Sequence, residues 1–136
     1  MKYRWKTISS LEKIFFHNFD ALKEETHGSM FKNEIYSFQL AGEFKNTELV
    51  KTTCKIEIES EIAPYISLYS VGYVPNDLPT IEIDDDDEYL TKEPGLFPDP
   101  LFRIRDNTFT LCDHQVRGVW VCTEPKGEIS GCFDIK

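Results

Sequence analysis

The chain has 136 residues, 40% of them hydrophobic and 29% charged, which is enough to bury a core as one globular domain. Its formal net charge of −9 at pH 7 repels nucleic acids and anionic membrane surfaces, and no basic cluster offsets it. No segment approaches the roughly 20 apolar residues of a membrane-spanning helix, and no secretory signal is evident. We therefore expect one cytoplasmic domain, residues 1–136, with no nucleic-acid or membrane partner.

The first half of the chain is dominated by side chains that alternate between apolar and polar, the period of a strand with one buried face. Such patterns cover residues 3–15, 33–44, 50–60 and 64–75, and a polar loop is expected over residues 18–29. Within the third pattern, Cys54, Ile56 and Ile58 alternate with charged residues, so we expect these three to face the core.

The second half adds short strand patterns with turn signals between them. They cover residues 101–105, 108–111, 117–125 and 129–136. Together these patterns predict an all-β fold, an antiparallel two-sheet β-sandwich of the immunoglobulin or galactose-binding-like kind. The last pattern reaches Lys136 without a turn. We therefore expect the natural protein to continue beyond it, with this domain at its N-terminus.

Residues 76–100 show no pattern of a regular element, so a long irregular loop is expected there. The segment PGLFPDPL, residues 94–101, carries three prolines, which fix φ and remove backbone donors. We expect Leu96 and Leu101 to plug one end of the sandwich. Phe97 and Asp99 are candidates for contact with another domain or a ligand, because rigid loops lose little entropy on binding.

Several stretches together carry a family resemblance. In chain order they are SLEKIF, NEIYSFQL, APYISLYSVGYVP, EYLTKEPGLFPDPL, and GVWVCTEP followed by GEISGCFDIK. They resemble the N-terminal β-sandwich domain of proteins carrying domain of unknown function 4091, relatives of glycoside hydrolase family 123. The resemblance spans residues 10–136, and its most specific part is Tyr89-Leu90 followed by PGLFPDPL.

The resemblance implies a non-catalytic accessory domain of an N-acetylhexosaminidase-like glycoside hydrolase. Its partner would be a downstream (β/α)₈ barrel, which would hold the catalytic Asp-Glu pair, so no catalytic residue and no cofactor are assigned to this chain. Tyr89, Phe97, Asp99 and Trp5 are the candidates for ligand or interdomain contact. Two alternatives stay open: a carbohydrate-binding module that contacts glycan, and a stand-alone protein-interaction domain.

An acidic run is the main candidate for a cation site. It comprises Asp84, Asp85, Asp86 and Asp87, flanked by Glu82 and Glu88. It lacks the ligand spacing and the glycine of a calcium loop, so we expect a solvated loop and no metal. Cys112 and His114 would share one side of a strand, but no second ligand pair accompanies them. The four cysteines form no C-x-x-C pair and are expected to be buried free thiols.

Two tryptophans could stack on a sugar ring, because the face of an aromatic ring suits the C–H side of a pyranose. Trp120 lies between Val119 and Val121, which favours a core or interdomain role. Trp5 lies between Arg4 and Lys6, which favours exposure. For both tryptophans we expect packing over sugar binding, and Trp5 is the one kept as a candidate for ligand contact.

Overall fold

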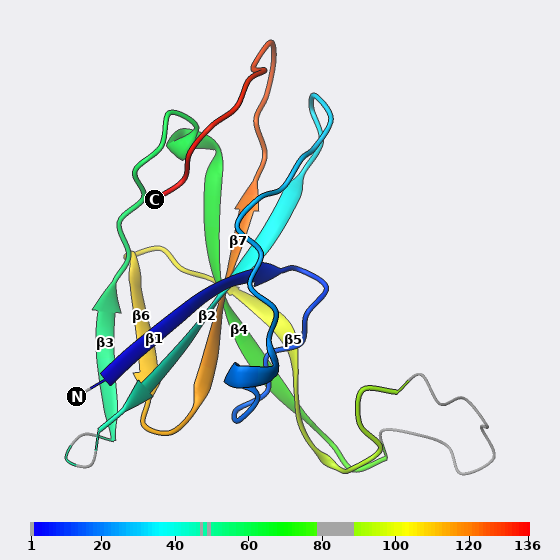
Figure 1. Cartoon of the computed structure of the whole chain (residues 1–136), viewed down its shortest axis with the longest axis vertical. Coiled ribbons are helices and arrows are strands. Elements are labelled where there is room, and N and C mark those ends of the chain that lie inside the picture. Colours follow the sequence, from blue (N-terminus) through cyan, green and yellow to red (C-terminus); the bar gives the residue numbers. More distant parts are fainter. Residues whose placement is uncertain (1, 47, 49, 79–88) are drawn as a thin grey trace.

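The computed structural model describes residues 2–46, 48, 50–78 and 89–136. These residues form two antiparallel sheets, which confirms the predicted all-β sandwich (Figure 1). The large sheet has the order β1 (Lys2–Ser9), β2 (Tyr36–Lys45), β7 (Val116–Thr123), β4 (Ile66–Asn76) and β5 (Gly95–Arg103). The small sheet pairs β3 (Lys51–Lys55) with β6 (Thr108–Cys112). Two single turns of 3-10 helix, η1 (Phe19–Ala21) and η2 (Ala63–Tyr65), complete the described elements, and neither is long enough to span a membrane.

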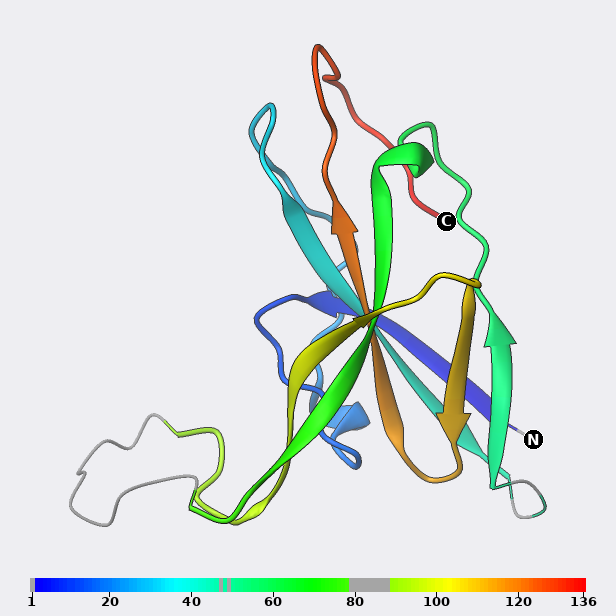
Figure 2. The same ribbon diagram turned by 180° about the vertical axis from the view of Figure 1, so that it is seen from behind.

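The two faces of the large sheet bury two separate cores. We call the face toward β3 and β6 the inner face and the opposite one the outer face. The inner core consists of Phe44, Leu68, Phe109, Leu111, Val119 and Val121. The outer core consists of Ile8, Ile14, Phe19, Leu22, Ala41 and Val116, and it lies beneath the connection between β1 and β2. Figure 1 has this connection in front of the sheet, and Figure 2 presents the inner face with the small sheet.

The β1–β2 connection is fastened to the sheet by hydrogen bonds that start from the strands. The Nζ atom of Lys6 donates to the carbonyls of Phe19 at 2.9 Å and Leu22 at 3.0 Å. The backbone N–H of Val116 donates to the carbonyl of Phe16 at 2.8 Å. The loop expected over residues 18–29 therefore acts as the cover of the outer face, although it contains only one helical turn.

The proline-rich segment is a strand, so the prediction of an irregular loop there is wrong. β5 pairs with β4 and lies at the edge of the large sheet, where a strand can lack donors on one side. The register shifts between Val71 and Tyr73, opposite the prolines. Leu96 and Leu101 are 46% and 42% exposed, so they do not plug the sandwich as predicted. Only residues 77–78 and 89–94 of the described chain keep the irregular form expected over residues 76–100.

The end of the chain also departs from the prediction. Residues 129–136 form no strand, although Glu59 and Lys136 exchange two backbone hydrogen bonds of 3.0 Å. The predicted orientation of residues 50–60 is confirmed, since Cys54, Ile56 and Ile58 pack against the inner core. β3 itself ends at Lys55, so the two isoleucines keep the alternation beyond the strand.

Phe44 of the inner core is fully buried, and this burial predicts the effect of its removal on stability. Replacing a buried phenylalanine by alanine removes apolar contacts and leaves a cavity. We expect Phe44→Ala to lower the free energy of unfolding by about 3–5 kcal/mol, measured by urea denaturation. The control is Phe31→Ala, because Phe31 is 85% exposed and should change stability by less than about 0.5 kcal/mol. Equal losses at the two positions would contradict the assigned core.

Candidate functional site

The outer face carries a hollow of about 160 Å³ beside the edge of the β1–β2 connection, which we call the outer hollow. Its lining includes Trp120, Asp99, Gln39, Leu101, Glu12 and Lys13. The first four come from β7, β5, β2 and β5, and the last two come from the connection. The hollow is therefore built where the cover of the outer face stops and the sheet continues.

The strand register places four functional side chains in one row across the outer face. Gln39, Trp120, Tyr69 and Arg103 are successive Cα partners on β2, β7, β4 and β5. Trp120 thus lies between the amide of Gln39 and the phenol of Tyr69. Both aromatic side chains are only partly buried, so the row offers aromatic surface to a ligand.

Both ends of this row are held by specific contacts. Gln39 is buried, and its Nε2 donates to the carbonyl of Ser9 at the end of β1 and to those of Ser10 and Glu12 in the connection, of which Glu12 is the nearest at 2.8 Å. The guanidinium of Arg103 lies 5.3 Å from the centre of the Tyr69 ring, and its Nη1 donates to the Tyr69 hydroxyl at 3.2 Å. The exposed carboxylate of Asp99 sits on the rim between Pro98 and Pro100.

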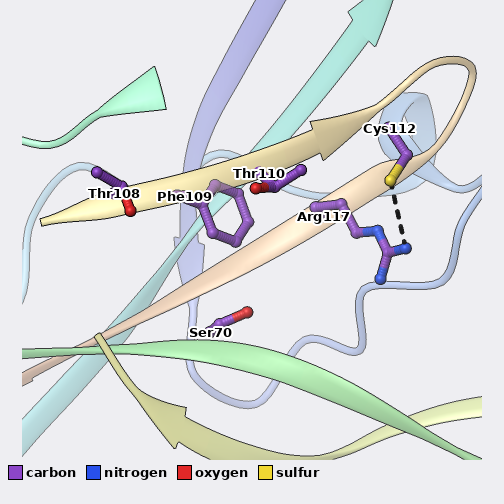
Figure 3. A pocket seen from close by; sticks show the side chains of 6 residues that line it. All are labelled: Ser70, Thr108, Phe109, Thr110, Cys112 and Arg117. Atoms are coloured by element: carbon purple, nitrogen blue, oxygen red, sulfur yellow. Dashed lines mark hydrogen bonds between the residues drawn. The ribbon is translucent and has the colours of Figure 1, made fainter. Parts of the chain in front are cut away.

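The inner face carries a second hollow, of about 360 Å³, which we call the inner hollow (Figure 3). Its lining is Ser70, Thr108, Phe109, Thr110, Cys112 and Arg117. It therefore lies between β6 above and β7 and β4 below, with Ser70 on the opposite side from the β6 side chains (Figure 3).

Arg117 is the charged group of the inner hollow. Its guanidinium lies 4.7 Å from the Phe16 ring centre and 5.3 Å from that of Tyr73. The Nη2 atom donates to Oε1 of Gln115 at 2.8 Å and approaches Sγ of Cys112 at 3.7 Å. Its Nε atom is buried, and no described residue accepts a hydrogen bond from it.

Tyr73 anchors this cluster to the β1–β2 connection. Its hydroxyl donates to the Ile14 carbonyl at 2.9 Å. Burial raises the pKa of Tyr73 to about 12, although the nearby Arg117 charge lowers it in part. The phenol is therefore neutral at physiological pH and serves as a structural donor.

The predicted contact residues do not form one site. Asp99 lines the outer hollow, whereas Trp5 lies on the inner face with its ring over Gly42 and 6.5 Å from Phe109. A Cβ at position 42 would lie 2.4 Å from the Trp5 ring, so a glycine is required there. Phe97 is partly buried against Phe15, with ring centres 5.8 Å apart. Tyr89 is partly buried, and its ring centre lies 5.9 Å from Nζ of Lys92.

The candidate metal ligands are also separated or not described. Asp84, Asp85, Asp86 and Asp87 lie outside the described residues. His114 adopts φ of +57° in the turn after β6, so it does not share a strand side with Cys112 as expected. Within residues 2–46, 48, 50–78 and 89–136, no three candidate ligands cluster.

The four cysteines are free thiols, as predicted, but they are less buried than expected. Cys54, Cys112 and Cys122 are partly buried, and Cys132 is exposed. Burial raises the pKa of the Cys54 thiol, which keeps it protonated and poorly nucleophilic.

Comparison with known proteins leaves the family of this chain open. A scan of known protein-family models finds no match, and no curated protein matches the chain significantly. The similarity to the domain 4091 proteins therefore rests on the sequence stretches quoted above.

The raised pKa of Tyr73 predicts a pH dependence of stability. The folded-state pKa of about 12 lies above the unfolded value of about 10. The neutral Tyr73 phenol therefore stabilises the fold fully below about pH 10, and this stabilisation is lost as the pH approaches 12. The free energy of unfolding of the wild type should therefore fall more steeply across this window than that of Tyr73→Phe. Urea titrations at stepped pH measure the difference. At neutral pH the variant should lose about 1 kcal/mol with the hydrogen bond to Ile14. Parallel pH profiles would contradict the assignment.

Proposed function

We propose that this chain is a non-catalytic β-sandwich module of a glycoside hydrolase-like protein and that it binds a neutral sugar residue at Trp120, where the outer hollow borders the neighbouring Tyr69. The observation that carries the proposal is the pair Trp120 and Tyr69, adjacent on the exposed part of a rigid sheet. Aromatic faces pack against sugar C–H groups, and polar groups around them orient the hydroxyls.

The polar groups around this pair suit a neutral ligand with many hydroxyls. Asp99 and Glu12 can accept hydrogen bonds from hydroxyls, and Lys13 and Arg103 can donate to them. The two acidic and two basic side chains balance locally, and the chain as a whole carries a net charge of −9. An anionic glycan is therefore disfavoured. The family resemblance supports an N-acetylhexosamine as the first ligand to test.

The platform of the site is already fixed without a ligand. Gln39 is held by three carbonyls, Tyr69 by Arg103, and Trp120 by its two neighbouring strands. A preformed site loses little conformational entropy when it binds, which matters for a small ligand that makes few contacts.

Titration of the chain with neutral mono- and disaccharides, including N-acetylhexosamines, tests this proposal. We expect weak binding, with NMR shifts centred on Trp120, and a loss of about tenfold in affinity in Trp120→Ala. Asp99→Ala, at an exposed carboxylate, should also weaken binding without affecting the fold. The matched control is Trp5→Ala, which removes the other tryptophan from the opposite face and should leave affinity unchanged. Absence of binding at millimolar sugar, or equal losses in the two tryptophan variants, would refute the sugar site.

A second candidate function is the accessory role expected from the resemblance, packing against a downstream barrel. The observation that favours it is the exposure of Leu96 and Leu101 on β5. Because Pro98 and Pro100 remove donors from this edge, a neighbour would dock on side chains and would not extend the sheet.

Thiol labelling can test this accessory role. Leu96→Cys should be labelled several-fold more slowly when the downstream domain is attached than in residues 1–136 alone, with peptide mapping to separate it from the native thiols. Phe31→Cys is the control and should react equally in both, because Phe31 lies outside the expected contact. Equal labelling of position 96 in the two proteins would count against packing through β5.

A further inference from the structure

Along β6, the main-chain N–H and C=O groups of successive residues point alternately toward β3 and away from it. Two hydrogen bonds show which residues point toward β3. The N–H of Ile56 donates to the carbonyl of Asn107 at 2.7 Å, and the N–H of Asp113 donates to the carbonyl of Val50 at 2.8 Å. The register between β3 and β6 runs without a shift between these bonds. In an antiparallel pair, hydrogen-bonded residue pairs alternate with non-bonded ones. Phe109 and Leu111 therefore direct their main chain toward β3.

Thr108, Thr110 and Cys112 consequently direct their N–H and C=O groups away from β3. Two of these groups are occupied, since Asp106 accepts from the N–H of Thr108 and Gln115 donates to the carbonyl of Cys112. The others have no hydrogen-bond partner among the described residues. They are the carbonyl of Thr108, both groups of Thr110 and the N–H of Cys112. This half of β6 is an open sheet edge, ready to pair with another strand.

The open edge borders a shelf formed by the inner face of β4 and β5. The small sheet has two strands against five in the large one, and β6 contacts β2 and β7. Figure 2 shows β6 apart from β4 and β5, with the link that follows β5 leading to β6. Ser70 and Phe102 are Cα partners on this shelf. Phe102 is 61% exposed and lies against Gly72, where a Cβ would be 2.4 Å from its ring.

The inner hollow separates this edge from the shelf, and among the described residues that line it only Arg117 is charged. The buried Nε of Arg117 has no described acceptor, although the other end of the guanidinium is bonded. The Arg117 side chain as a whole is only partly buried, so a carboxylate in the hollow would complement the charge of its guanidinium. A ligand that fits these surroundings would pair with the main chain of β6, make apolar contact with Phe102 and carry one negative charge.

We propose that the open edge of β6 binds a single extended peptide segment of another polypeptide, which adds a third strand to the small sheet. Alternate side chains of this peptide would cover Ser70 and Phe102, and an acidic side chain would face Arg117. A second copy of the chain is a poor occupant. Pairing β6 with β6 of another copy would bring a second five-stranded sheet into the layer that β4 and β5 already fill. The proposal is independent of the sugar site, which lies on the opposite face.

The test uses the whole chain and a blocked six-residue peptide of alternating valine and threonine with one glutamate, at up to millimolar concentration. Backbone NMR should show slowed amide exchange at Thr110 and Cys112 when the peptide is added. Thr110→Pro removes an outward donor and should weaken binding about tenfold. The matched control is Thr53→Pro, because Thr53 is the cross-strand partner of Thr110 and directs its N–H to the opposite edge. The affinity of the Thr53→Pro variant for the peptide should stay unchanged.

Phe102→Ala gives a second test if either proline variant fails to fold, because an exposed side chain can be removed safely. This variant should lower the affinity for the peptide several-fold, and replacement of the peptide's glutamate by glutamine should have a similar effect. The proposal would be overturned by no change at the Thr110 amide with millimolar peptide, by equal losses of affinity in Thr110→Pro and Thr53→Pro, or by protection of Thr110 in a dimer without peptide. Shifts confined to the Trp120 row would also overturn it.

Discussion

The structure depends on one five-stranded sheet that must bury apolar side chains on both faces, while the chain supplies two unequal covers. On the outer face the β1–β2 connection contributes Ile14, Phe19 and Leu22. On the inner face β6 contributes Phe109 and Leu111, and Cys54 of β3 packs against the same core. Neither cover extends over all five strands. The two hollows lie where these covers end. The candidate sites therefore arise because the covering segments are too small to cover both faces of the sheet completely.

Alternation along the sequence was enough to predict the fold class, because strand period is a local property. It correctly oriented Cys54, Ile56 and Ile58, which continue inward even beyond the end of β3. The error at residues 94–101 has a definite cause. Prolines exclude a central strand but allow an edge strand, and which strand becomes the edge is decided by long-range pairing that a single sequence does not show.

The two tryptophans show why site prediction was harder than fold prediction. The charged neighbours of Trp5 suggested exposure, and it is 42% exposed, yet its ring covers Gly42 on the inner face. Trp120 lies between Val119 and Val121, which suggested the core. Because those valines face the inner core, the pleat turns Trp120 to the outer face. The alternation in the sequence was therefore enough to predict which face Trp120 occupies. Its position beside Gln39 and Tyr69 could not be predicted, because it depends on the register between strands.

The two proposed binding surfaces share a strand without sharing a side chain. On β4, Tyr69 belongs to the outer row and the next residue, Ser70, lines the inner hollow. Successive side chains of a strand point to opposite faces, so one strand can serve a sugar on one side and a peptide strand on the other. Their chemistry also differs, since the outer row offers balanced charges around aromatic surface and the inner edge offers unpaired main-chain groups beside Arg117. A ligand that fits one surface therefore lacks the features that the other surface recognises.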